Sequence, residues 1–508
     1  MNSPKVRVRF APSPTGGLHL GGVRTVLFNY LFAKKNQGTF ILRIEDTDQN
    51  RFVEGAEEYI FDCLEWCGLT PDESVRQGGE YGPYRQSERK EIYKKYAEQL
   101  VDSGHAYYAF DTPEELAAMR ENYKSKENPN PQYGHAIRNK MRNSLTLSVN
   151  ETQKLLANNT PFVIRIKVPE NETIHFTDII RGTIAHDLNT VDDKVLLKAD
   201  GMPTYHLAAV IDDHLMKISH VFRGEEWLPS APVHFLLWRF LGLENETPEY
   251  AHLPLILKPD GNGKLSKRDG ERLGFPVFAM QWKDDSGAIV KGFKEEGFLP
   301  EAFVNMLALL GWNPGSEQEI FTLSELEESF SLERVHKGGA KFDYEKAKWF
   351  NQQHIQRADN ERLADLVRPY FEKEDIPTSK EDMIKVIAII KERCHLLTEF
   401  VQQGSFFFKA PKSIDEAAIK PKWNDQKTSF FREWMTTFNF DEHAHGAWEN
   451  SFNEMVAKHG IKKGEVMMPL RIMLVGGKFG PGIFDIAAFV GKDEVKKRIE
   501  TVLALMKN

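Results

Sequence analysis

The sequence predicts an α/β protein, with a doubly wound sheet in its first part and an all-helical C-terminal half. Two patterns predict the sheet: an alternating stretch leads through a glycine-rich turn into a helix, and the apolar run Phe40–Ile44 ends in acidic residues, where sheets of this kind carry their ligand sites. Helical spacing then continues from residue 346 onward. A chain of 508 residues is too long for one core, so we expect several domains.

The first predicted strand, turn and helix carry the strongest local signal. Apolar side chains alternate with arginines along Val6–Phe10, Pro12–Gly22 forms a tight turn, and a helix continues to Lys35. Glycines let a ligand approach the backbone closely, and the free N–H groups of a helix N-terminus attract anions. Taken alone, the stretch fits an ordinary strand-to-helix turn as well as it fits a ligand-binding turn.

After the predicted strand Phe40–Ile44 the pattern indicates two helices. From about residue 111 the pattern of the sequence then changes. We expect a helix over Ala56–Cys67 and another that Ser87 caps and Gly104 closes. Thr112 then begins a helix with a capping box, and the alternating residues 162–168 form a strand. This block interrupts the sheet as an insertion.

The sheet resumes near residue 196. Residues 198–205 form a turn, Leu207–Ile211 is predicted as a short buried strand, and Val221–Trp227 is predicted as a strand that ends in charged residues. A helix over 231–241 and a basic loop, Lys264–Arg268, come next.

Composition excludes several classes of protein. The chain has 41% apolar and 28% charged residues, no apolar run long enough to cross a membrane, and no signal peptide pattern. Three cysteines, Cys63, Cys67 and Cys394, cannot build a disulfide framework. We therefore expect a cytoplasmic protein without a membrane partner. Cys63 and Cys67 have a spacing conceivable for a metal pair, but without further ligands a buried apolar stripe explains them better.

The net charge of −8 argues only weakly against a nucleic-acid partner, because RNA recognises local patches of charge. Basic clusters do occur, at Lys337–Lys348, Lys462–Lys463 and Lys492–Arg498.

Two short motifs, taken together, point to a family. His19–Gly22 has the sequence His-Leu-Gly-Gly, and Lys264–Arg268 has the sequence Lys-Leu-Ser-Lys-Arg. They resemble, in order and separation, the His-Ile-Gly-His and Lys-Met-Ser-Lys-Ser signatures of class I aminoacyl-tRNA synthetases. More narrowly, the chain resembles the bacterial-type glutamyl-tRNA synthetases. The blocks that carry this resemblance are Arg9–Gly16, Arg43–Asp48, Pro83–Arg89 and Gly339–Asp343.

The resemblance implies five parts. A Rossmann-like nucleotide-binding catalytic domain in two halves, 1–110 and 196–275, surrounds an inserted domain, 111–195, that binds the tRNA acceptor end. Residues 276–345 form a helical connecting domain, and 346–508 form the helical region that binds the anticodon. The implied partners are L-glutamate and tRNA(Glu), and the family habit implies a monomer.

The implied reaction has two steps. Glutamate attacks the α-phosphate of ATP to give glutamyl-adenylate and pyrophosphate, and the terminal adenosine of the tRNA then takes the glutamyl group. Catalysis therefore needs positioning and positive charge near the phosphates. We expect His19, Lys264 and Lys267 to be catalytic, with Lys267 the first choice for phosphate contact, and Mg²⁺ to accompany ATP. The expected ATP-binding residues are His19, Gly21, Gly22, Glu226, Ile256, Lys264 and Lys267.

Because the side chain of glutamate is an anion, its pocket must supply guanidinium groups. Arg9 and Arg223 suit the distal carboxylate, and Tyr205 adds a hydroxyl. Glu45 suits the α-ammonium, and Ser13 is placed to orient the substrate. The alternative interpretation of each arginine is an ordinary surface ion pair.

Two departures from the family pattern bear on the site. Family members commonly have an Asn shortly after the tyrosine, whereas Tyr205 is followed by His206–Ala209, which puts the polar contacts there in doubt. Many members also carry a zinc knuckle after the sequence that matches Ala106–Tyr107. Here those positions are Tyr108 and Phe110, so we expect no zinc and no protein metal site.

Several alternatives remain. Pro12–Thr15 differs from the Pro-Pro-Glu-Pro-Asn of glutaminyl-tRNA synthetases, which argues against glutamine as the substrate. A truncated relative that glutamylates a modified nucleoside within a tRNA lacks the half that follows residue 346. A non-catalytic tRNA-binding paralogue would not need His19, Lys264 and Lys267, and a small nucleotidylyltransferase would not need the helical half.

Overall fold

The structure, a computed structural model, describes residues 5–283 and 286–506. It has two compact units. The first comprises the chain up to Glu295 together with Phe303–Tyr344, and the second comprises Glu296–Ala302 together with the chain from Glu345 onward. Each unit has a hydrophobic core of its own.

A six-stranded sheet lies at the centre of the described part of the first unit, in the order β2-β1-β8-β9-β5-β6. Its strands are β1 (Arg7–Phe10), β2 (Thr39–Leu42), β5 (Thr173–Asp178), β6 (Gly182–Asp187), β8 (His220–Gly224) and β9 (Glu249–Leu253). Neighbouring strands pair in parallel, except that β6 pairs antiparallel with β5 at one edge.

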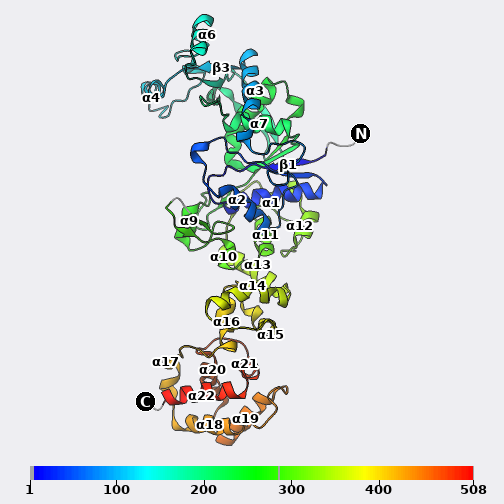
Figure 1. Cartoon of the computed structure of the whole chain (residues 1–508), viewed down its shortest axis with the longest axis vertical. Helices are drawn as coiled ribbons and strands as arrows, with labels where there is room; N and C mark the ends of the chain where they lie inside the picture. The colour runs from blue at the N-terminus through cyan, green and yellow to red at the C-terminus, as the bar shows by residue number, and fades with distance from the viewer. Residues whose placement is uncertain (1–4, 284–285, 507–508) are drawn as a thin grey trace. The chain divides into compact units, whose positions relative to one another are not determined.

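Helices cover both faces of this sheet, and Figure 1 shows α1 and α7 on opposite sides of β1. The covering helices are α1 (Leu20–Lys35), α7 (Tyr205–Leu215) and α8 (Ala231–Phe240). On one face, the ring of Phe32 from α1 lies 5.1 Å from that of Phe222. On the other, Phe235 from α8 packs against a core cluster that includes Val221 and Tyr250. Successive residues of a strand point to opposite faces, so the predicted doubly wound α/β fold is confirmed.

The order of the strands reverses at β1. From β1, helix α1 leads to β2 on one side, whereas β8 lies on the other. In open α/β sheets, ligands bind outside the carboxyl ends of the strands at such a reversal. Phe10 and Gly224 end β1 and β8, so the binding crevice is expected beside these two residues.

Leu207–Ile211, predicted as a buried strand, lies in helix α7, so that prediction was wrong. Five consecutive apolar residues fit a buried strand and a buried helix equally well. The buried stretch of the helix continues through Asp212 and Asp213, and these two carboxylates become important below.

The predicted cap of the helix after Ser87 was also wrong. Ser87 lies in a short 3₁₀ segment, Gln86–Arg89, whose path is held by a 2.8 Å hydrogen bond from the Ser87 N–H to Asp46 Oδ1. The α-helix that follows, α3 (Lys90–Asp102), has Arg89 at its N-cap and ends before Gly104, whose positive φ suits glycine.

A smaller antiparallel sheet, β3-β4-β7, has its middle strand within the residues predicted as an insertion, 111–195, whereas β3 lies before them and β7 begins at their last residue. Its elements and the neighbouring helices are β3 (Ala106–Ala109), α4 (Pro113–Asn122), α5 (His135–Arg138), α6 (Val149–Ala157), β4 (Val163–Ile166) and β7 (Val195–Leu197). Thr112 and Glu115 form the predicted capping box of α4. The hairpin β5–β6 also falls within residues 111–195 but joins the central sheet, because alternation marks a strand without saying which sheet it extends.

The remaining described elements of the first unit, some of which reach into the second, are α2 (Ala56–Trp66), β10 (Ile256–Leu257), α9 (Lys267–Leu273), β11 (Trp282–Lys283), β12 (Ile289–Val290), α10 (Phe293–Glu296), α11 (Pro300–Ala308), α12 (Leu323–Ser329) and β13 (Ala340–Lys341). Residues 276–345, predicted to be helical, thus also contain short strands.

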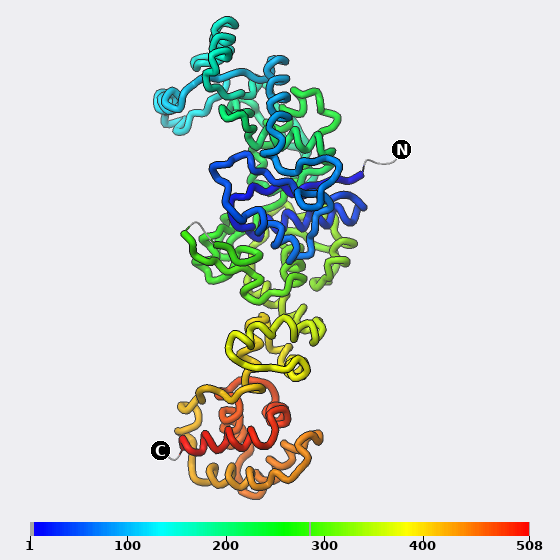
Figure 2. The backbone as a smooth tube through the Cα atoms, viewed as in Figure 1, coloured from blue at the N-terminus to red at the C-terminus, as the bar shows by residue number. Residues whose placement is uncertain are grey.

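In the second unit the described elements are all helices, as the sequence predicted; Figure 2 shows their course in yellow to red. The main ones are α13 (Tyr344–Arg357), α14 (Asn360–Lys373), α15 (Lys380–Ile390), α16 (Glu399–Phe408), α17 (Glu416–Ile419), α18 (Asp425–Thr436), α19 (Ala447–His459), α20 (Lys463–Val475), α21 (Ile483–Val490) and α22 (Lys492–Leu505). Aromatic residues are central to the core, where the buried ring of Trp434 lies 5.0 Å from Phe452 and 5.1 Å from Phe438.

Candidate active site

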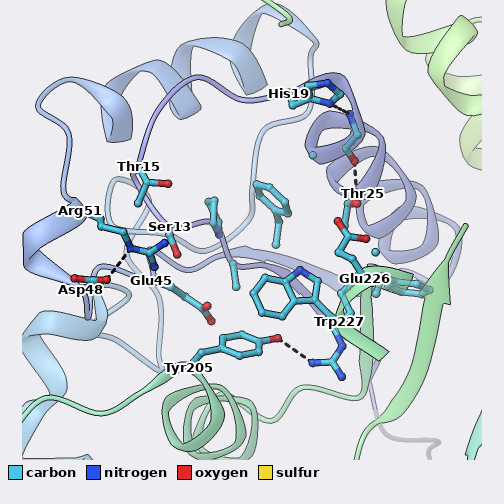
Figure 3. A pocket seen from close by; sticks show the side chains of 18 of the residues that line it. Ser13, Thr15, His19, Thr25, Glu45, Asp48, Arg51, Tyr205, Glu226 and Trp227 are labelled. Carbon is cyan, nitrogen blue, oxygen red and sulfur yellow. Dashed lines mark hydrogen bonds and ion pairs between the residues drawn. The ribbon is translucent and has the colours of Figure 1, made fainter. Parts of the chain in front are cut away.

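A cavity of about 990 Å³ opens at the carboxyl ends of β1 and β8, where the strand order reverses (Figure 3). It brings together every residue that the sequence analysis assigned to ATP or glutamate. These are Arg9, Ser13, His19, Gly21, Gly22, Glu45, Tyr205, Arg223, Glu226, Ile256, Lys264 and Lys267. Residues that are far apart in the chain therefore line one space.

The glycine-rich turn allows close packing at the mouth of the cavity. Gly16 has φ +142°, a conformation that favours glycine, and a Cβ on Gly17 would lie 2.8 Å from the Trp282 ring and 2.9 Å from that of Phe278. A Cβ on Gly22 would lie 2.7 Å from Leu18. Larger residues would thus push the turn away from the parts of the chain that cover it.

His19 is the N-cap residue of helix α1, and its ring is placed to act as a hydrogen-bond donor. Its Nδ1 accepts the N–H of Gly21 at 3.2 Å, so the proton of a neutral ring sits on Nε2. Burial, with Lys264 and Lys267 nearby, lowers the pKa of His19 to about 4. Within the described part of the chain, the buried Nε2 has no hydrogen-bond partner, which leaves its N–H for a ligand.

The two lysines of the second motif differ in their surroundings. Lys264 lies in the loop and pairs with Glu226, and the N–H of Leu265 donates to the Ile256 carbonyl at 2.8 Å, which ties the loop to β10. Lys267, expected in the loop, is instead the first residue of α9, whose capping box is formed by Ser266 and Asp269. Within the described residues no carboxylate lies within ion-pair distance of Lys267.

An ionic network lies buried beneath the cavity. Asp213 Oδ1 accepts hydrogen bonds from Arg9 Nε at 2.9 Å and from Arg43 Nη1 at 2.8 Å. Arg43 in turn donates to Glu45 Oε1 at 3.2 Å. Sequence reasoning assigned neither Arg43 nor Asp213 to the site. For Asp213, residues 207–211 of α7 were predicted as a strand, and the two consecutive acidic residues after that apolar run were the signal that could have identified it.

Burial raises the pKa of Glu45 to about 7, against the opposing effect of the Arg43 and Arg9 guanidinium groups. Figure 3 shows Glu45, Ser13 and Tyr205 on one side of the cavity, and His19 on the other side. The carboxylate of Glu45 is therefore available to a cation that enters the cavity, with its charge dependent on pH near neutrality.

Arg223 is only 5% exposed, and its guanidinium is held by three neutral groups. Its Nη1 donates to the Tyr205 hydroxyl at 2.9 Å and to His234 Nδ1 at 3.3 Å, and its Nε donates to His252 Nε2 at 2.9 Å. Among the described residues Nη2 is buried without a partner. The sequence analysis missed both histidines, since neither lies within a family motif.

Tyr108 and Phe110, the positions at which we expected no zinc, belong to an aromatic cluster. The rings of Tyr108 and Phe110 lie 5.1 and 6.2 Å from Phe162. Among the described residues, no group of three or more His, Cys, Asp or Glu side chains is placed to hold a metal ion. None of the described helices combines the length and apolar character needed to cross a bilayer.

Comparison with known proteins covers both units. Residues 5–349 match the family of class I tRNA synthetases (E and Q), catalytic domain, and residues 362–503 match an anticodon binding domain. The chain is 52% identical to the glutamate–tRNA ligase of Flavobacterium johnsoniae and 54% identical to that of Christiangramia forsetii, in each case over 99% of this chain and 100% of the relative. The crystal structure of a glutamate tRNA ligase from Elizabethkingia meningosepticum in complex with its amino acid superposes with a TM-score of 0.94, at 49% identity, over 99% of this chain and 100% of that one.

Proposed function

Because the chain belongs to the glutamate–tRNA ligase family of class I tRNA synthetases, we propose that it activates L-glutamate with ATP and transfers it to the 3′-terminal adenosine of tRNA(Glu). One observation supports glutamate as the amino-acid substrate. Among the described residues, Arg223 is a buried guanidinium that has no carboxylate as a hydrogen-bond partner and whose Nη2 donor is free, which calls for an anionic ligand group. Glutamate supplies that group at the end of its side chain.

The amino acid would be held at both ends. Arg223 and the Tyr205 hydroxyl bind the distal carboxylate, and Glu45 binds the α-ammonium. The charge of Arg9 is largely matched by Asp213, so Arg9 serves mainly as a hydrogen-bond donor at the cavity wall. Ser13 supports the substrate from the turn after β1.

ATP would occupy the part of the cavity beside α1. The Nε2–H of His19 and the ammonium groups of Lys264 and Lys267 stabilise the negative charge that builds on the phosphates as glutamate attacks. Gly21 and Gly22 let the nucleotide approach the helix start, the backbone at Ile256 lines the same space, and Glu226 lies beside the nucleotide as the partner of Lys264.

Magnesium would enter with ATP rather than bind to a site of the protein. The phosphate side of the cavity carries mainly cationic and neutral donors, with the Glu226 carboxylate beside them, and such a set does not suit a dedicated cation site. Mg²⁺ is commonly held by phosphate oxygens and water in such enzymes. The residues named above would therefore act on the ATP–magnesium complex as a substrate.

The rest of the chain would bind the tRNA. Residues 111–195 would hold the acceptor end, 276–345 would contact the stem, and 346–508 would hold the anticodon, which the match of 362–503 to an anticodon binding domain supports. We propose a monomer that works in the cytoplasm. Its buried free thiols Cys63 and Cys67 are suited to a reducing compartment.

The test is ATP–pyrophosphate exchange and aminoacylation with purified protein, using glutamate or glutamine, each with and without tRNA. We expect exchange and charging with glutamate when tRNA is present. Exchange with glutamate that does not need tRNA, and without charging, would instead favour glutamylation of a nucleoside within tRNA. No exchange under any condition would favour a non-catalytic tRNA-binding paralogue.

A further inference from the structure

The three arginines behind the cavity fall into two electrostatic classes. Arg9 and Arg43 share the carboxylate of Asp213, and Arg43 also contacts Glu45. Arg223 differs, because within the described residues no carboxylate lies within ion-pair distance of its guanidinium. Its acceptors are a phenol and two imidazoles. It is as buried as Arg9, yet among the described residues no carboxylate offsets its charge.

The hydrogen bonds require both imidazoles to be neutral. A guanidinium can only donate, so His252 Nε2 and His234 Nδ1 must be acceptors and carry no proton. The proton of His252 then lies on Nδ1, 2.6 Å from Asp178 Oδ2. The pKa of His234 is lowered well below its usual value by burial and by Arg223, and burial lowers that of His252 too.

The second ring nitrogen of each histidine, the one that does not face Arg223, also lies close to a polar partner. Asp178, at the end of β5, accepts the N–H groups of Ile180 and Arg181 on Oδ1, so its carboxylate is fixed and Oδ2 faces His252. His234 Nε2 lies 3.3 Å from His206 Nδ1. The negative charge of Asp178 therefore orients the His252 ring while staying one imidazole away from Arg223.

We propose that His252 and His234 are positioning residues that hold Arg223 in place with neutral acceptors, so that its charge is reserved for the distal carboxylate of the substrate. This inference rests on the proposed function and deepens it. It assigns the preference for a carboxylate over a carboxamide to residues that lie behind the cavity wall.

The physical reason is the cost of a buried unpaired charge. A carboxylate at position 234 or 252 would hold Arg223 equally well but would neutralise it, and the substrate anion would then have no charge to meet. With neutral acceptors, a bound glutamine leaves Arg223 without a counter-ion, whereas glutamate supplies one. Discrimination of this kind is large when a buried group is left unpaired by the wrong substrate.

The experiment compares two variants of the same shape that differ in charge. His234→Asn keeps a neutral acceptor near the place of Nδ1, and His234→Asp puts a carboxylate there. His252→Gln makes the matching neutral replacement at the other ring, because its amide oxygen can reach the place of Nε2. The control is His220→Asn. His220 lies on the same strand as Arg223, outside the cavity lining, with its Nδ1 on Ser219.

Aminoacylation is measured with glutamate and with glutamine at saturating ATP and tRNA(Glu), and thermal unfolding checks that each variant folds. For His234→Asp we expect the KM for glutamate to rise about 100-fold or more, with the KM for ATP within about threefold of wild type. The glutamate-over-glutamine ratio of kcat/KM should fall about 30-fold or more. His234→Asn and His252→Gln should stay within about fivefold of wild type, as should the control.

Equal effects of His234→Asn and His234→Asp in folded proteins would overturn the inference, since a merely structural role does not depend on charge. An unchanged preference for glutamate in His234→Asp would overturn it too. If instead the wild-type protein charged no tRNA with glutamate, the proposed function itself would fail, which the wild-type measurement alone reveals.

Discussion

The ammonium of Lys264 forms an ion pair with Glu226 Oε1 at the mouth of the cavity. Both side chains are partly exposed, 52% and 38%, so the pair contributes little to stability. It does keep Lys264 beside the proposed nucleotide site, where the carboxylate would compete with a triphosphate for the same ammonium group.

Replacing Glu226 by Gln should release Lys264. An exposed pair contributes at most about 1 kcal/mol, so we expect the KM for ATP to fall by up to about fivefold, with the KM for glutamate unchanged. Steady-state pyrophosphate exchange over a range of ATP concentrations measures this. A higher KM for ATP would show that the Glu226 carboxylate contacts the nucleotide or its magnesium directly.

Replacing Lys267 by Ala should abolish most adenylate formation while the fold stays intact. The side chain has no carboxylate partner among the described residues, so its removal leaves no unpaired group. Loss of one charged donor at the transferring phosphate should lower kcat by about 100- to 1,000-fold or more. Pyrophosphate exchange gives the rate, and Lys283→Ala in the nearby strand β11 is the control. Turnover near that of the wild type would exclude a catalytic role for Lys267.

Replacing Arg223 by Ala should weaken the interaction with glutamate. The loss of a buried, charge-assisted contact should lower kcat/KM for glutamate at least about 100-fold, with a much smaller change in the KM for ATP. Arg239→Ala is the matched control, because Arg239 pairs with Glu172 outside this cavity. If kcat/KM for glutamate did not change, Arg223 would be a structural residue.

Activity should depend on pH through Glu45. Its pKa is raised to about 7 by burial, and binding of the α-ammonium needs the ionised form. As pH falls below 7, the carboxylate becomes protonated, and kcat/KM for glutamate should fall about tenfold per pH unit. Kinetics between pH 5.5 and 8.5 test this, and Glu45→Gln should have low activity with that pH dependence removed. A flat profile in the wild type would contradict this role.

Replacing Asp213 by Asn should destabilise the first unit. Arg9 and Arg43 would lose their shared counter-charge in a buried site, which typically costs about 3–5 kcal/mol. Urea unfolding followed by circular dichroism measures the change in the free energy of unfolding. The control is Asp365→Asn, an exposed partner of Lys380, for which we expect less than about 1 kcal/mol. Equal small effects would mean that water reaches the two arginines.

Local patterns sufficed for much of the fold. The alternation along residues 6–10, the glycine turn and the capping box at Thr112 each describe interactions between residues close in sequence, and each has its predicted form. The resemblance to the family supplied the residues assigned to ATP and glutamate, and all of them line one cavity.

The wrong prediction of a strand over residues 207–211 has a simple physical cause. Leu207–Ile211 is apolar throughout, so no periodicity distinguishes strand from helix, and only packing against the sheet selects the helix. That helix places Asp213 under Arg9 and Arg43, a contact that no local pattern encodes.

By itself, the sequence determined the class of fold, the succession of strands and helices around the two motifs, and a group of residues that proved to line one cavity. The tertiary structure alone decided which arginine has a carboxylate partner. Arg9 and Arg223 are alike as strand-end arginines, but folding places Asp213 beside one and the neutral rings of His234 and His252 beside the other. Charge compensation depends on distances between residues far apart in the chain, and these exist only once the chain has folded.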